Sequence, residues 1–171
     1  MKWIVTSIML ALCVPTMAQV VLSEELKKTF EEGERAFRKQ QYEEALVHYN
    51  KVLEAEADYM NGYLRRGQCY NRLKQYEKAI ADFSYIIEQK PRETFALNSR
   101  AGAYNRLNQP DKCIEDCNTV LSYDPKNTTA FNNRGWAKKA KGDHDGACKD
   151  WKTAKKYGDE NAKIILKNNG C

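Results

Sequence analysis

Small and apolar residues recur along this chain every 34 positions. Four registers show the recurrence, each in chain order: Gly33, Gly67, Ala101, Gly135; Ala45, Ala79, Cys113, Ala147; Tyr49, Phe83, Cys117, Trp151; and Val52, Ile86, Val120, Ala154. Within each unit the apolar positions follow helical spacing in two runs, and a polar break separates the runs. The pattern predicts two helices in every unit, and therefore an all-α protein.

Turn chemistry marks where these helices end. Pro110 suits the first position of a helix, because the N–H that proline lacks has no partner there, and Gly142-Asp143 separates the two helices of the last unit. Pro91 and Pro125 end the second helices of two units, since a residue before proline resists the helical conformation. These signals divide residues 26–161 into four units: 26–59, 60–93, 94–127 and 128–161.

These registers and prolines resemble the tetratricopeptide repeat (TPR) family, whose 34-residue unit shows Leu-Gly, Tyr, Ala, an aromatic, a small residue and proline in that order. The resemblance covers residues 26–161 and implies a right-handed α-solenoid of four helix-turn-helix hairpins. Four residues depart from the pattern. Thr29 replaces a large apolar residue, Lys138 replaces an aromatic, and Pro110 and His144 stand where the first two units have tyrosine. We expect these departures to alter local packing and to leave the fold unchanged.

A stack of hairpins needs a cap, because its last hairpin cannot bury its outer face alone. Residues 162–171 are expected to form a C-terminal capping helix and tail, with Ala162, Ile165 and Leu166 as its apolar stripe. The segment from Gly146 to Cys171 also looks like the last repeat of exported bacterial envelope members of the TPR family.

The N-terminal residues 1–18 have the pattern of a signal peptide, followed by a short segment, 19–25, before the repeats. Lys2 supplies the positive charge, residues 3–14 are mainly apolar, and Ala18 provides a small residue for cleavage before Gln19. A lipid-modified Cys13 is the alternative, and Leu12 argues against it because a small residue is preferred there. The interpretation predicts an exported protein, periplasmic or extracellular, without a membrane span after cleavage.

Six cysteines are present, and five remain after that cleavage. Cys148 lies in the last repeat and Cys171 ends the tail that should fold over it, so a disulfide could join them and stabilise the fold by about 3 kcal/mol. The alternative is two small apolar residues without a bond. Cys113 and Cys117 occupy core positions, and Cys69 is expected to be an inert buried thiol facing the first unit.

Composition and charge argue against several functional classes, among them nucleic-acid binders and enzymes. The chain has 171 residues with 42% hydrophobic and 30% charged residues, which fits one soluble domain after the leader. A net charge of +5 is too small and too dispersed for a nucleic-acid binder. His48 and His144 are the only histidines, and both are expected to be ordinary helix or turn residues. No catalytic set, cofactor or metal site is predicted, and tight packing in the repeat register is taken to explain the glycines.

The TPR resemblance implies a concave groove lined by the first helix of every hairpin. Its positions correspond here to Phe30, Phe37, Arg38, Leu64, Gln68, Asn71, Arg72, Phe95, Asn98, Asn105, Arg106, Asn132, Trp136 and Lys139. A carboxamide can bond a peptide backbone and an arginine can bind a carboxylate, so the repeated Asn-Arg steps at 71–72 and 105–106 favour peptide binding. The alternative is that these residues only keep a helix surface soluble, with Phe95 and Trp136 packed inward.

These observations favour a non-catalytic scaffold that binds a protein or peptide partner in its groove, in the cell envelope or outside the cell. The basic positions with which a well-known TPR subgroup binds chaperone C-termini are absent, since Phe30 and Glu34 stand at the first two of them. A structural or assembly subunit of an envelope complex, or a self-oligomer, is the alternative function. The sequence specifies neither the partner nor the oligomeric state.

Overall fold

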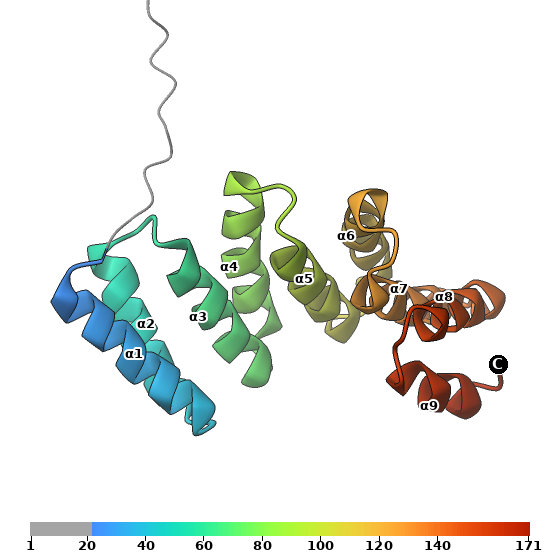
Figure 1. Cartoon of the computed structure of the whole chain (residues 1–171), viewed down its shortest axis with the longest axis horizontal. Helices are drawn as coiled ribbons and strands as arrows, with labels where there is room; N and C mark the ends of the chain where they lie inside the picture. Colours follow the sequence, from blue (N-terminus) through green and yellow to red (C-terminus); the bar gives the residue numbers. More distant parts are fainter. Residues whose placement is uncertain (1–21) are drawn as a thin grey trace, which may run out of the picture.

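The computed structural model describes residues 22–171, and in that part of the chain it has nine α-helices and no strand. The helices are α1 (Glu24–Arg38), α2 (Tyr42–Ala55), α3 (Met60–Arg72), α4 (Tyr76–Gln89), α5 (Thr94–Arg106), α6 (Pro110–Tyr123), α7 (Thr128–Ala140), α8 (His144–Lys156) and α9 (Asn161–Asn168). They follow one another in a row from α1 to α9 (Figure 1). The predicted all-α solenoid is confirmed, whereas the predicted signal peptide lies outside the described residues.

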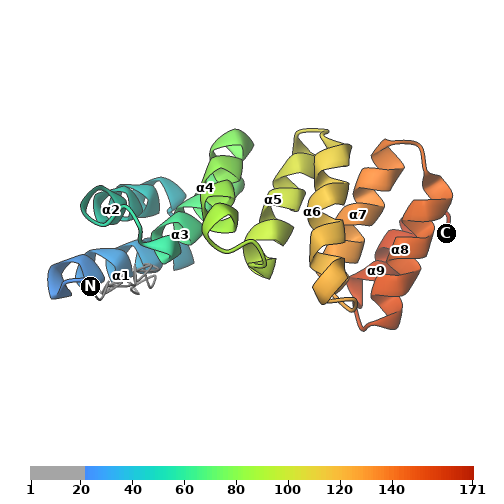
Figure 2. The same ribbon diagram turned by 90° about the horizontal axis from the view of Figure 1, so that it is seen from above.

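Successive helices pair into four hairpins, α1–α2, α3–α4, α5–α6 and α7–α8, each of which also contacts the next (Figure 2). The ends of the helices follow local chemistry. Helix α1 begins ahead of residue 26 because the Ser23 side chain accepts a hydrogen bond from the Leu26 N–H, and Asn127 and Asp143 cap α7 and α8 in the same way. Pro110 is the first residue of α6, as the sequence predicts.

A small residue on each first helix allows the second helix of the hairpin to approach closely. A Cβ atom built on Gly33 would lie 2.7 Å from the ring of Tyr49, and one on Gly135 would collide with the Trp151 indole. Both aromatic side chains are fully buried. The sequence register of small and aromatic residues therefore corresponds to the core of the hairpins.

The first helices lie on the inner side of the row. Helix α5 contacts α7 and α3 contacts α5, whereas no comparable contact joins the second helices of different hairpins within residues 22–171. Elements that meet from one hairpin to the next lie on the inside of a curved stack, so α1, α3, α5 and α7 line its concave face.

Helix α9 covers the end of the stack, against α8. Ala162 is fully buried and Leu166 nearly so, and Leu166 belongs to a cluster with Ala147 and Trp151 of α8. Ile164 points outward and is 61% exposed. No helix in residues 22–171 combines the length and apolar character needed to cross a bilayer.

Candidate peptide-binding face

All fourteen residues predicted to bind a peptide lie on the first helices. They are Phe30, Phe37 and Arg38 of α1; Leu64, Gln68, Asn71 and Arg72 of α3; Phe95, Asn98, Asn105 and Arg106 of α5; and Asn132, Trp136 and Lys139 of α7. We call the surface of α1, α3, α5 and α7 that carries them the concave face. Their environments differ along the stack, and these differences indicate which of them can contact a ligand.

The aromatic residues of the concave face divide between its two ends. Near the N-terminal end, Phe30 packs against Tyr49, with ring centroids 5.4 Å apart, and is only partly exposed. Near the C-terminal end, Phe95 is 46% exposed and Trp136 is 42% exposed, although Trp136 also packs edge-on against Trp151. Phe95 and Trp136 therefore both keep free aromatic surface, and the inward packing considered for them is seen only in part, where Trp136 contacts the buried Trp151.

Asparagine side chains on α5 and α7 have incomplete hydrogen bonding. Asn98 donates to the Asn127 side chain at 3.1 Å and Asn132 donates to Asp159, but the Oδ1 atoms of Asn98 and Asn132 are buried without a partner in the described residues. An unpaired buried carbonyl costs about 1–3 kcal/mol. Because both oxygens are buried, a ligand could bond them only after the carboxamides rotate toward the surface.

The two Asn-Arg steps do not have equal environments. Asn71 has a buried Oδ1 without a partner among the described residues, whereas Asn105 donates to the Asn133 carbonyl of α7 at 2.8 Å. Asn133 in turn donates to the Asn98 carbonyl of α5 at 3.0 Å. The Asn105 carboxamide thus joins neighbouring hairpins, and the sequence repeat alone could not distinguish it from Asn71.

Gly102 leaves open space in the middle of α5. It stands between Asn98 and Asn105 at helical spacing, and a Cβ atom built on it would meet nothing within 4 Å. Glycine inside a helix costs about 1 kcal/mol relative to alanine, so it is an unfavourable choice for a surface position. The prediction that tight packing explains the glycines is wrong for Gly102, because that position lies outside the repeat register and faces no neighbouring side chain.

Exposed guanidinium groups follow one edge of the concave face. Arg38, Arg72 and Arg106 recur at the 34-residue spacing in the last turns of α1, α3 and α5, and all three are exposed. None of them makes an ion pair within residues 22–171. The C-terminal end of a helix carries partial negative charge that stabilises a cation there. The row is therefore available to carboxylates of a ligand.

Three buried ion pairs each join the two helices of one hairpin, and the arginine of each also bonds the preceding hairpin; none of them was predicted from the sequence. Arg100 of α5 donates to both carboxylate oxygens of Asp116 on α6, at 2.9 and 2.7 Å, and its remaining Nη1 donates to Ser84 of the preceding hairpin at 2.8 Å. The corresponding sets are Arg66, Asp82 and Asn50; and Arg134, Asp150 and Asn118. The sequence signal that could have revealed these ion pairs is the recurrence of both the arginines and the aspartates every 34 residues.

The core thiols are not suited to chemistry. Cys69, Cys113 and Cys117 are fully buried, and burial raises the pKa of Cys69 to about 12. The Cys117 pKa is also raised, chiefly because its side chain shares a hydrogen bond with Cys113 and secondly because it is buried. Thiols with raised pKa values stay protonated and are poor nucleophiles. Their positions agree with the core-filling role predicted for them.

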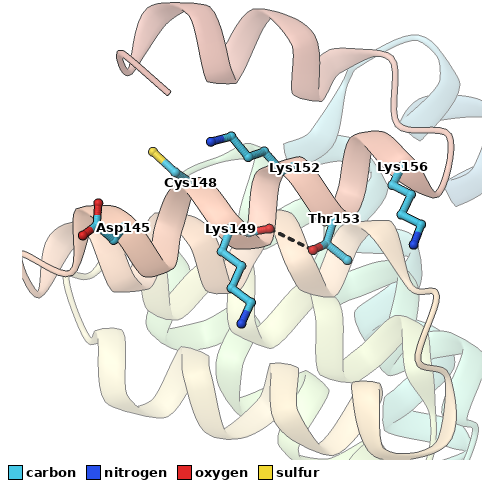
Figure 3. A pocket seen from close by; sticks show the side chains of 6 residues that line it. All are labelled: Asp145, Cys148, Lys149, Lys152, Thr153 and Lys156. Atoms are coloured by element: carbon cyan, nitrogen blue, oxygen red, sulfur yellow. Dashed lines mark hydrogen bonds between the residues drawn. The ribbon is translucent and has the colours of Figure 1, made fainter.

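Cys148 and Cys171 are paired in the structure, with Cα atoms 5.5 Å apart, which is within the usual range for a disulfide. The pairing connects α8 to the tail that follows α9. His144, expected from the sequence to be an ordinary residue, lies beside this pair: one ring nitrogen and the two Sγ atoms are all within 4.8 Å of one another. A shallow pocket that Cys148 lines opens next to it on α8 (Figure 3).

Comparison with known families agrees with this architecture. Two family models, each described as tetratricopeptide repeat, match residues 30–94 and 96–127. The chain belongs to the tetratricopeptide repeat family. The family pattern places leucine directly before the glycine of the first helix. Here that position holds Glu32, Arg66, Arg100 and Arg134, so the buried ion pairs replace an apolar contact of the TPR pattern.

Solved TPR structures share the fold at low sequence identity. YrrB, described as a TPR protein with an unusual peptide-binding site, has a TM-score of 0.76 at 19% identity, over 84% of this chain and 74% of its own. MamA from Desulfovibrio magneticus RS-1 has a TM-score of 0.73 at 20% identity, over 77% and 75%. TTC0263 from Thermus thermophilus has a TM-score of 0.67 at 14% identity, over 78% and 75%. No curated protein sequence matches the chain.

Proposed function

We propose that this TPR protein is a non-catalytic scaffold that binds an extended peptide segment of a protein partner on its concave face. The open backbone at Gly102 is the observation that carries the proposal. It lies between Asn98 and Asn105 of α5, and the partly exposed rings of Phe95 and Trp136 belong to the same face. A glycine that no packing requires allows the main chain of a ligand to approach the helix closely.

The ligand chemistry follows from the groups on this face. Rotation of the Asn98 and Asn132 carboxamides would present their buried, unpaired Oδ1 atoms to peptide N–H groups, and the exposed rings can pack against apolar side chains. Arg72 and Arg106 can bind carboxylates. An extended segment with neutral and acidic side chains fits these groups best. The peptide-binding site named for YrrB gives a precedent on the same fold.

Filling the space at Gly102 tests this proposal. Peptides selected on the wild-type protein from a phage-displayed library of random peptides are the probe. Gly102→Leu places a side chain where the ligand backbone should lie, so binding of the selected peptides should fall at least about tenfold while the helix, freed of its glycine, becomes more stable. Fluorescence polarisation measures the affinity, and circular dichroism during heating measures the stability.

Ala81→Leu is the matched control, because it adds the same side chain at an exposed position of a second helix, α4. It should leave peptide affinity unchanged. Selected peptides that bind Gly102→Leu as tightly as the wild type would exclude this face as the binding site.

Location outside the cytoplasm is the second part of the proposal. The leader pattern of residues 1–18 supports this location. The pairing of Cys148 with Cys171 also supports it, because disulfides persist in oxidising compartments. Mass spectrometry of the protein from fractionated cells should find a chain that begins at Gln19 in the periplasmic or extracellular fraction. It should also find two fewer free thiols before reduction than after. A cytoplasmic chain that retains Lys2 and all its free thiols would contradict this part.

Charge asymmetry supports the alternative function of an assembly subunit. Residues 22–59 contain ten Asp and Glu against six Lys and Arg, whereas residues 128–171 contain five against ten. Opposite charge at the two ends of the row favours head-to-tail association between copies. Sedimentation velocity should then show oligomers at low ionic strength that dissociate at high salt. A monomer at every ionic strength would exclude head-to-tail self-association and leave the peptide-binding proposal intact.

A further inference from the structure

Three side chains that commonly bind metals meet at the C-terminal end of the stack. His144 is the first residue of α8 and Cys148 follows four positions later, so both project from one face of the helix. Cys171 reaches the same place from the tail after α9. One ligand atom from each, a ring nitrogen and two sulfurs, lies within 4.8 Å of the other two. The chain thus brings residues distant in sequence into one cluster.

The three ligand atoms are grouped tightly enough for one zinc ion to reach all of them once the disulfide is reduced. Zinc binds thiolate sulfur at about 2.3 Å and imidazole nitrogen at about 2.0 Å, so neighbouring ligand atoms in a tetrahedral site lie roughly 3.5–4 Å apart. The two sulfurs are bonded to each other in the disulfide, so reduction must first let them move apart, and side-chain rotation then brings both sulfurs and the ring nitrogen to that separation. Two thiolates, one imidazole and one water complete four-coordination, and two thiolates neutralise the charge of the ion.

The elements that carry the cluster are fixed without the disulfide. Helix α9 is held on α8 by the packing of Ala162 and Leu166, and the Cys171 N–H donates to the Leu166 carbonyl at 3.1 Å. Reduction of the disulfide would therefore leave the two thiols close together. His144 is exposed, which gives solutes access to the cluster.

The pocket beside the cluster has a charge that suits thiolates. Its lining includes Lys149 and Lys152, and the Lys152 side chain points toward α9 on the same side as Cys148 (Figure 3). An ammonium group beside two thiolates offsets part of their negative charge. Asp145 lines the same pocket and adds one negative charge to it.

We propose that the cap is a redox-gated site for a thiophilic divalent cation such as Zn²⁺, bound by His144, Cys148 and Cys171 only when the disulfide is reduced. A dithiol reductant converts the cap disulfide to two thiols and is itself oxidised to a disulfide. The cation then displaces both thiol protons to water and binds the two sulfurs and the imidazole. Oxidation and metal binding exclude each other, because each uses both sulfur atoms.

Cobalt titration of the intact chain tests the site, because Co²⁺ takes zinc positions and gives thiolate charge-transfer and d–d absorption bands. Protein reduced by a phosphine and freed of reductant under anaerobic conditions should bind one Co²⁺ per chain with thiolate bands. Added Zn²⁺ should abolish those bands. The oxidised protein should show none.

Substitutions assign the ligands. His144→Ala should weaken Co²⁺ binding by about tenfold or more, and His48→Ala, which removes the other histidine, should match the wild type. Cys148→Ser and Cys171→Ser should each remove the two-thiolate spectrum, with circular dichroism used to verify that the helices persist. The proposal is wrong if the reduced protein gives no thiolate band, if the band survives either serine substitution, or if His144→Ala binds as tightly as His48→Ala.

Discussion

Glu32 and His48 form in the first hairpin the contact that an arginine and an aspartate form in the other three. The Nδ1 atom of His48 lies 3.7 Å from the Glu32 carboxylate, and both side chains are partly exposed. The acidic residue here stands on the first helix and the basic residue on the second, which reverses the polarity of the later pairs. Within residues 22–171 no hairpin lies before the first one, whereas each arginine of the later pairs also bonds a side chain of the hairpin before it.

This comparison predicts unequal costs for equivalent substitutions. Arg100→Leu leaves Asp116 buried without its cation and also removes the bond to Ser84, so it should lower the free energy of unfolding by about 3 kcal/mol. Glu32→Leu removes only a long, partly exposed contact and should cost less than about 1 kcal/mol. Urea denaturation followed by circular dichroism measures both.

The double variant Arg100→Leu/Asp116→Leu separates the two causes of that loss. It removes the stranded carboxylate, so it should recover most of the stability lost in Arg100→Leu. A double variant as unstable as the single one would show that the loss comes from packing rather than from the unpaired charge.

The sequence predicted the hairpins because small and aromatic residues repeat where backbones must approach, as at Gly33 and Tyr49. The buried arginine–aspartate pairs were not predicted from the sequence. An arginine such as Arg66, next to the glycine register, is normally interpreted as a surface residue. Its burial becomes evident only when Asp82, sixteen positions later, is considered as its partner. The first-helix location of the candidate site followed from the repeat. Which of its groups remain free did not, because the Asn105 bond to α7 depends on how the hairpins stack.

The turn between the helices of each hairpin predicts a simple gain in stability. Gln40, Lys74, Asn108 and Gly142 occupy the same repeat position and all have positive φ, and glycine is the only one without a Cβ penalty. Lys74→Gly should therefore stabilise the protein by about 0.5–1 kcal/mol, and Gly142→Ala should destabilise it by about 1 kcal/mol. Thermal unfolding of both variants gives the comparison, and equal shifts of the same sign would contradict it.

Two glycines on first helices should respond oppositely to alanine. At Gly135 a new Cβ would overlap the buried Trp151 indole, so Gly135→Ala should destabilise the protein by about 1–3 kcal/mol. At Gly102 the Cβ enters open space, and Gly102→Ala should stabilise the protein by up to about 1 kcal/mol through helix propensity. The melting temperature of Gly135→Ala should lie below that of the wild type, and the melting temperature of Gly102→Ala should lie above it.

Alkaline pH should destabilise the protein through Cys69. Burial raises the pKa of this thiol from its ordinary value of 9.0 to about 12, so between these values the folded chain keeps a proton that the unfolded chain releases. The stabilisation is complete below pH 9 and is lost as the pH rises, by about 1.4 kcal/mol for each pH unit up to 12. Cys69→Ala removes this titration, so its stability should fall less steeply over the same range. Urea midpoints at several pH values measure the slopes, and parallel curves for wild type and Cys69→Ala would show that other groups cause the alkaline loss.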